Sequence, residues 1–357
     1  MPDPYLQLAK QLDELPNGFP PTENGVELRL LEKLFSPEEA SLAAGLHLGL
    51  ETPEQIGERL GLDDPELRNK FKSMARKGLI ATGRVAGGLG YGLLPFVVGI
   101  YEMQVGRLDE ELAKIFEDYY LQAFGKILQV QPAVHRIIPV MESVRIDMEI
   151  HPYESAASII DSAAAWGVLD CICRKQKALI GDPCEHPVDV CMALSARPGA
   201  FDNTTVVKAQ TRVEALDTLQ RAAQAGLVHS VSNSQSGVTY ICNCCTCSCG
   251  ILRGLADLGI ANVVARSAFV NTLDESRCIA CEDCIPACQF GALSMNTFVV
   301  INGMRCVGCG VCVLACPEGA LRLERRPIPE VMLPPATERD WQRQRAAARG
   351  IDFEKLL

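Results

Sequence analysis

Cysteine is the residue type that offers most chemistry in this chain. There are 17 cysteines among 357 residues, and all of them lie at or after Cys171. An odd number cannot be consumed by disulfides alone, and thiols in a reducing compartment bind metals more often than they pair. The sequence begins without a basic region followed by an apolar core, and its longest apolar run, Leu93–Ile100, is too short to span a bilayer. We therefore expect a cytoplasmic metal–thiolate protein without a membrane span.

Two cysteine runs near the end of the chain form an internal repeat. "CIACEDCIPACQFGAL" begins at Cys278 and "CVGCGVCVLACPEGAL" begins at Cys306. A constant offset aligns all four cysteines of each run and the Gly-Ala-Leu that follows them. Zinc ribbons use C-x-x-C pairs separated by a longer loop. Runs of four cysteines therefore favour iron–sulfur clusters over zinc.

The repeat resembles the bacterial 2[4Fe-4S] ferredoxin family over residues 270–324. The resemblance implies two [4Fe-4S] clusters, each held by three cysteines of one run and the last cysteine of the other. The first cluster would take Cys278, Cys281, Cys284 and Cys316, and the second Cys306, Cys309, Cys312 and Cys288. Small residues would let the backbone approach the sulfurs at Ala280, Gly308 and Gly310. Gln289 departs from the proline that the family pattern has after this cysteine, and we expect an altered turn with the ligand retained.

The first upstream cysteines are spaced C-x-C-x10-C-x6-C, at Cys171, Cys173, Cys184 and Cys191. Four thiolates complete one ligand set. The spacing predicts a third [4Fe-4S] cluster, with zinc as the alternative because four thiolates also satisfy tetrahedral zinc. We expect His186 to support this site without ligating the metal. Three basic residues would offset its negative charge, namely Arg174, Lys175 and Lys177.

Five more cysteines occur in "ICNCCTCSCG", at Cys242, Cys244, Cys245, Cys247 and Cys249. The segments "LVHSV" and "VTYICNC" predict a hairpin whose second strand continues into this run. In an extended strand, Cys242 and Cys244 would face one side and the other three cysteines the opposite side. The run could then share one or two further [4Fe-4S] clusters with the Cys171–Cys191 set. Alternatively, it turns sharply and binds a cluster alone.

The first 170 residues contain no cysteine. After an N-terminal tail (1–21), three helix starts with N-cap residues and prolines are expected at Ser36, Thr52 and Asp64, followed by a glycine-rich hairpin at "GGLGYG". Residues 22–100 thus resemble a winged helix-turn-helix domain, with a recognition helix over 65–77. Its basic residues would contact DNA, or be solvated on a docking module: Arg68, Lys70, Lys72, Arg76 and Lys77. The glycine loop lacks the G-x-G-x-x-G spacing of nucleotide sites.

The expected fold class is α+β. The winged-helix-like domain would be followed by a helical connector (101–165), a cysteine-rich α/β metal-binding domain (166–269), the ferredoxin-like domain (270–324) and an extended tail (325–357). The connector's His135 and His151 have no ligand partners nearby in sequence. Prolines keep the tail extended as far as Trp341, before a short basic helix. This tail would clamp either its own domain or a partner subunit.

The net charge of −10 weighs against nucleic-acid binding, which depends on cationic contacts with phosphate. We expect a ferredoxin-like subunit that relays single electrons through several clusters to or from a larger oxidoreductase. Its partners would be redox proteins or enzyme subunits, and no catalytic residues are predicted. The alternative is a redox- or iron-responsive regulator that binds DNA through the winged helix. Catalysis at an irregular cluster ranks last because no acid–base residues accompany it.

Overall fold

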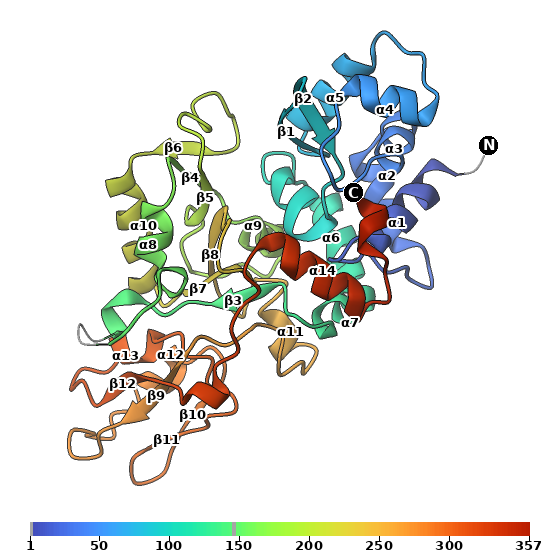
Figure 1. Cartoon of the computed structure of the whole chain (residues 1–357). Coiled ribbons are helices and arrows are strands. Elements are labelled where there is room, and N and C mark those ends of the chain that lie inside the picture. The colour runs from blue at the N-terminus through green and yellow to red at the C-terminus, as the bar shows by residue number, and fades with distance from the viewer. Residues whose placement is uncertain (1–2, 145–147) are drawn as a thin grey trace. The chain divides into compact units, whose positions relative to one another are not determined.

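The computed structural model describes residues 3–144 and 148–357, and it combines helices and small sheets as expected for the α+β class (Figure 1). Residues 1–2 of the predicted tail and 145–147 of the predicted connector lie outside the described residues. The chain forms two compact units. The first comprises the chain up to Gln131 with Leu179–Asp182 and Gln342–Leu357, and the second comprises Pro132–Ala178 with Pro183–Trp341.

The first unit begins with five helices and a hairpin: α1 (Pro4–Glu14), α2 (Val26–Leu34), α3 (Pro37–Ala44), α4 (Pro53–Leu60), α5 (Leu67–Arg76), β1 (Ala81–Val85) and β2 (Gly88–Gly92). The capping boxes predicted at Ser36 and Thr52 are confirmed. The third start is wrong, because α5 begins at Leu67. Asp64 instead accepts a hydrogen bond from the backbone N–H of Glu66 (2.8 Å), a turn that delays the helix. Most of the predicted N-terminal tail is the helix α1, capped by Asp3.

The first unit continues with η1 (Phe96–Ile100), η2 (Glu102–Gln104), α6 (Glu110–Tyr119), η3 (Tyr120–Phe124) and α7 (Gly125–Gln129). In η1, the backbone angles of residues 97–99 are not helical. The chain ends in α14 (Glu338–Ala348) and η7 (Phe353–Leu356). Arg345 of α14 is fully buried and donates hydrogen bonds to the carbonyls of Pro16, Ile127 and Val130. The end of the chain thus clamps its own first unit. The helix also begins before Trp341, so the extended part of the tail is shorter than expected.

The second unit is built on a six-stranded sheet of β3 (His135–Ile137), β4 (Ala165–Leu169), β5 (Cys191–Ser195), β6 (Lys208–Gln210), β7 (Val228–Ser232) and β8 (Tyr240–Cys244). The order is β3-β7-β8-β5-β4-β6, and all neighbours are antiparallel. The predicted β7–β8 hairpin is confirmed. Helix α8 (Ala156–Asp161) ends before the first cysteine, and strand β4 lies between this helix and Cys171. Trp166 and Val168 favour this strand because aromatic and β-branched residues suit a pleated surface.

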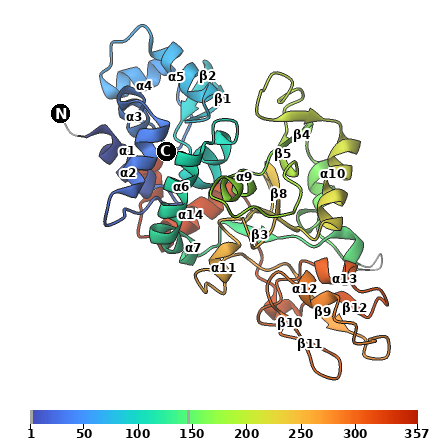
Figure 2. The same cartoon turned by 180° about the vertical axis from the view of Figure 1, so that it is seen from behind.

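One face of this sheet carries the apolar core. Helices α8 and α10 (Arg212–Gln224) cover it, and Ile160 and Leu219 pack with Met192, Leu194 and Ile241 of the strands. Side chains alternate along a strand. Cys191, Cys242 and Cys244 therefore face the other side, where α9 (Ile172–Leu179) lies across the sheet from α10 (Figure 2).

The C-terminal part of the second unit comprises α11 (Arg253–Ala256), β9 (Phe269–Leu273), α12 (Cys284–Ala287), β10 (Leu293–Met295), β11 (Val299–Ile301), α13 (Val311–Leu314) and β12 (Leu321–Arg325). Strand β9 pairs with β12, and β10 pairs with β11. Short 3-10 turns complete the unit: η4 (Met141–Ser143), η5 (Pro152–Glu154) and η6 (Ile328–Glu330). Across residues 3–144 and 148–357, no helix combines the length and apolarity that crossing a bilayer requires.

Candidate metal centres

The first thiol set consists of Cys278, Cys281, Cys284 and Cys316, which together line one pocket. These are the four cysteines that the ferredoxin resemblance groups around the first cluster. Burial, together with the neighbouring thiols of the other three cysteines, raises the pKa of the Cys284 thiol to about 11. Thiols from both cysteine runs thus converge on one place, as a four-iron cluster requires.

The second thiol set consists of Cys288, Cys306, Cys309 and Cys312. Burial raises the pKa of Cys309 to about 12, and the nearby thiols of Cys288 and Cys306 act in the same direction. The pKa of Cys312 is also raised, first by burial and then by the other three thiols of the set. Asn271 of β9 donates a hydrogen bond from Nδ2 to Cys312 Sγ (3.2 Å). This set takes one cysteine from the first run and three from the second, the reverse of the first thiol set.

The repeat is visible in the backbone of the two cysteine loops. Ala280 and Gly308 occupy equivalent positions with φ of 56° and 72°. Glu282 and Gly310 form a second equivalent pair, at 68° and 78°. Positive φ is uncommon for residues with a Cβ. Its recurrence at the same places in both runs indicates that the two cysteine loops share one backbone conformation.

The last cysteine of each run receives a matching hydrogen bond. The backbone N–H of Ala292 donates to Cys288 Sγ (3.3 Å), and that of Ala320 donates to Cys316 Sγ (3.2 Å). In each case the donor lies four residues after the sulfur. Hydrogen bonds to the ligand sulfurs are among the factors that set the reduction potential of an iron–sulfur cluster.

The two loops differ in exposure. In the first, residues 275–277 and 279–283 are exposed, including Cys281. In the second, Gly308 and Gly310 are buried, and a Cβ at Gly308 would lie 2.0 Å from the carbonyl oxygen of Phe269. A Cβ at Gly310 would lie 1.9 Å from Ser143 Oγ. The second loop therefore packs against the rest of its unit, whereas the first loop faces solvent.

Six upstream cysteines form a second kind of centre, on the sheet face opposite the apolar core. This six-cysteine group comprises Cys171, Cys173, Cys191, Cys242, Cys244 and Cys249. Hydrogen bonds from Cys173 and Cys191 lower the pKa of the Cys171 thiol. The pKa of Cys173 is raised, first by its hydrogen bond with Cys171 and then by that with Cys249. Cys244 in turn contacts Cys242 and Cys249. The thiols thus form a continuous chain of neighbours.

The structure divides the nine upstream cysteines differently from their spacing. Strand β8 ends at Cys244, and residues 246–248 form a turn in which the N–H of Cys249 bonds to the carbonyl of Cys245 (3.0 Å). The expected alternation holds for Cys242 and Cys244, but the turn brings Cys249 back beside Cys244. The alternation was expected only for an extended strand, and because the strand ends at Cys244, Cys249 does not lie with Cys245 and Cys247. Cys184 also lies apart from the other three cysteines of its spacing pattern.

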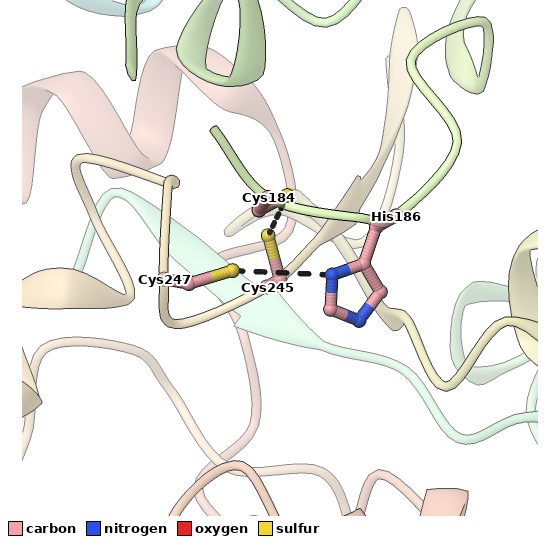
Figure 3. Close-up of side chains that lie close together, drawn as sticks. All are labelled: Cys184, His186, Cys245 and Cys247. Carbon is pink, nitrogen blue, oxygen red and sulfur yellow. Dashed lines mark hydrogen bonds between the residues drawn. The ribbon is translucent and has the colours of Figure 1, made fainter. Parts of the chain in front are cut away.

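Cys184, Cys245 and Cys247 instead meet His186 (Figure 3). We call these four residues the Cys3His group. Cys184 Sγ lies 3.9 Å from Cys245 Sγ, and Cys247 Sγ lies 3.9 Å from His186 Nδ1. The four donor atoms all lie within 4.8 Å of one another, and among the described residues no other group of three or more potential ligands is this tight. The cysteine spacing predicted only a supporting role for His186. The sequence feature that could have identified this group is a Cys-x-His pair, Cys184 and His186, together with a Cys-x-Cys pair, Cys245 and Cys247.

A buried guanidinium adjoins both upstream centres. Arg174 donates hydrogen bonds to the carbonyls of Asn243 (2.8 Å) and Pro187 (2.9 Å), and it contacts Cys245 Sγ at 3.6 Å. Burial opposes its charge, but the thiols of Cys171, Cys245 and Cys244 raise its pKa overall. Arg174 therefore supplies the expected counter-charge. Lys175 pairs with Asp170 instead.

The Cys245 thiol has the electrostatics of a metal ligand. Burial by itself would raise its pKa, but a hydrogen bond with His186 and the charge of Arg174 outweigh that effect and lower the pKa to about 6. A lowered pKa favours the thiolate near neutral pH.

Gln289 has a clear structural role. Its Oε1 accepts a hydrogen bond from the N–H of Thr246 (2.8 Å), and its Nε2 donates to the carbonyl of Gly226. Thr246 lies between Cys245 and Cys247 in the turn after β8. The residue that departs from the ferredoxin pattern therefore joins the second thiol set to that turn, through its neighbour Cys288.

The predicted DNA-contacting face of α5 is largely paired with acids. Arg68 binds Glu54 (2.8 Å), and Lys77 binds Glu39 (2.6 Å). Lys70 contacts Asp64 at 2.7 Å. These carboxylates would compete with DNA phosphates for the same cationic side chains.

Residues 277–320 match the family model described as a 4Fe-4S dicluster domain. No curated protein and no solved structure matches the chain. The matched segment contains all eight cysteines of the repeat. Two sets of four converging thiols suit the two clusters of that domain in donor type and number.

Proposed function

We propose that this protein is an iron–sulfur electron-transfer subunit that relays single electrons to or from a larger oxidoreductase. The observation that carries the proposal is the convergence of eight cysteines of the repeat into two complete four-thiol sets. A [4Fe-4S] cluster supplies one-electron oxidation and reduction. The chain's own groups hold the thiolates: the N–H groups of Ala292 and Ala320 and the amide of Asn271 all donate to ligand sulfurs.

The first thiol set is where a redox partner would dock. Cys281 is exposed, and the neighbouring Ile279 keeps 63% of its surface accessible. An apolar side chain in an exposed loop suits a transient protein contact. The second thiol set is enclosed by its own unit, so a partner's access to it would run through the first.

The six-cysteine group would hold a third [4Fe-4S] cluster. Four of its thiols suffice, and the buried charge of Arg174 offsets the anionic centre. Zinc is the alternative occupant for this group, because four thiolates satisfy it equally well. The relay would then contain the two clusters of the repeat, and a third cluster if the six-cysteine group holds iron and not zinc.

The first unit would serve as a docking module. The alternative, a DNA-binding regulator, draws support from helices α3–α5 followed by the β1–β2 hairpin, an order typical of winged helices. The ion pairs of Arg68, Lys70 and Lys77 and the net charge of −10 weigh against it. Phosphate contacts would first have to displace those carboxylates.

The test is iron quantification and EPR of the full chain, purified without oxygen and reduced with dithionite. We expect about twelve irons per chain, and an EPR signal from reduced clusters. Cys281→Ser should remove about four irons and the signal of one cluster. Ser276→Ala in the same exposed loop is the matched control and should change neither. A reconstituted protein without reducible iron would overturn the proposal.

A further inference from the structure

The donor distances of the Cys3His group identify the kind of metal centre it can form. Tetrahedral zinc binds sulfur at about 2.3 Å and imidazole nitrogen at about 2.0 Å, which places two sulfurs about 3.8 Å apart and sulfur and nitrogen about 3.5 Å apart. The two measured separations, Cys184 Sγ–Cys245 Sγ and Cys247 Sγ–His186 Nδ1, are both 3.9 Å. The atoms are already near the corners of a mononuclear site.

A four-iron cluster does not fit the same four atoms. Its ligands bind four different irons, so the width of the cluster separates the donor atoms in addition to two metal–sulfur bonds. The donors of the Cys3His group all lie within 4.8 Å of one another. The thiol sets of the dicluster domain are not packed this tightly among the described residues.

The donor types select the metal. Three thiolates and one imidazole form a Cys3His set, which is a common structural zinc site with no open position. Carboxylates, which harder cations such as magnesium prefer, are absent from the set. We propose that Cys184, His186, Cys245 and Cys247 bind one zinc ion, separately from the iron–sulfur centres.

This zinc would join two segments that are far apart in sequence. Cys184 and His186 precede β5, whereas Cys245 and Cys247 belong to the turn after β8. The same turn ends at Cys249 of the six-cysteine group, and its Thr246 is bound by Gln289 beside Cys288. Fixing the turn would therefore position the thiols of two other centres. Zinc has no redox chemistry, so it would add no station to the relay. The zinc site itself is independent of the proposed function, and only this positioning role rests on it.

The experiment measures zinc and iron together by mass spectrometry on the full chain. We expect one zinc per chain, and at least a fivefold loss of zinc in His186→Ala and Cys247→Ser. The iron and EPR signals of the dicluster domain should persist in both variants. His151→Ala, in the same unit but outside the group, should retain zinc. His186→Cys should also retain it, because four thiolates satisfy zinc.

A second measurement uses cobalt in place of zinc. The wild-type chain grown with cobalt should show the visible absorption of tetrahedral cobalt and the charge-transfer bands of cobalt–thiolate bonds. His186→Cys should shift these bands without removing them. Iron in place of zinc, zinc that survives both His186→Ala and Cys247→Ser, or cobalt spectra without thiolate bands would each overturn the zinc site. Zinc present in a chain without reducible iron would instead overturn the proposed function and leave the zinc site standing.

Discussion

Replacing Asn271 with valine should lower the reduction potential of the cluster held by the second thiol set and leave the other clusters unchanged. Asn271 is buried, and its Nδ2 donates to Cys312 Sγ at 3.2 Å. Its Oδ1 has no hydrogen-bond partner among the described residues. A buried amide oxygen without a partner costs about 1–3 kcal/mol. The side chain is therefore a poor contributor to folding, and its hydrogen bond to sulfur is its evident role.

The repeat supplies the choice of substitution. The same offset along the chain relates Cys284 to Cys312 and Asn271 to Val299, and Val299 packs in the same small core as Cys284. The first thiol set thus has valine where the second has a hydrogen-bond donor. Asn271→Val makes the second site resemble the first, and Val299→Asn is the reciprocal change.

The expected shift follows from the energy of a hydrogen bond to a charged group, which is about 1.5–3 kcal/mol. Only the part that differs between oxidised and reduced states moves the potential. Taking about one third to one half of the bond energy gives about 0.5–1.5 kcal/mol, or about 20–65 mV for one electron. The sign is negative, because the donor stabilises the more negative reduced state and its loss disfavours reduction.

An EPR-monitored redox titration of the full chain measures this shift. Thr272→Val, on the same strand, is the control, since the Thr272 hydroxyl donates to the carbonyl of Arg322 and not to sulfur. Val299→Asn should raise the potential of the first cluster by a similar amount. An unchanged or raised potential in Asn271→Val, or an equal shift of both clusters, would refute the reasoning.

Three further predictions concern other parts of the chain. Gly308→Ala should lower the iron content by about four irons per chain, because the added Cβ would clash with the Phe269 carbonyl. Ala280→Gly, at the equivalent exposed position, should retain the full iron content. Equal iron contents in the two variants would contradict the role given to burial. Gln289→Pro removes the hydrogen bonds to Thr246 and Gly226, so amide hydrogen exchange over residues 245–249 should accelerate several-fold. The iron content should be retained. Unchanged hydrogen exchange would show that Gln289 does not hold the turn. The full chain should show no salt-dependent binding to duplex DNA, whereas submicromolar binding that weakens in Lys70→Ala would favour the regulator.

The sequence was most informative where structure is local. The cysteine runs from Cys278 and Cys306 predict a dicluster domain because each loop holds its ligands within a few residues. The caps at Ser36 and Thr52 depend on contacts only three residues away. Asp64 has the same local pattern, but its side chain binds the N–H of Glu66 and the helix starts later. The Asp64 side chain can cap a helix that starts at the next residue, or it can close a turn by binding the N–H of Glu66. Residue spacing alone does not decide between these two conformations.

The partition of the upstream cysteines depends on tertiary structure. Cys191 and Cys242 meet because β5 and β8 are neighbours in the sheet, an order that spacing does not contain. Cys249 joins them only because the strand stops at Cys244. His186 was missed for the same reason, since its partners at Cys245 and Cys247 come from a distant turn.

The unequal exposure of the two ferredoxin loops also bears on how the protein would fail in air. Oxidants reach a thiolate–metal centre in proportion to its accessibility. The loop around Cys281 is open to solvent, whereas the loop around Gly308 is enclosed. Oxygen damage should therefore proceed from outside inward, with the outer cluster lost first and the inner one preserved. A brief exposure to air would therefore stop electron exchange with a partner while the inner cluster is still intact. Rebuilding the outer cluster alone would restore that exchange.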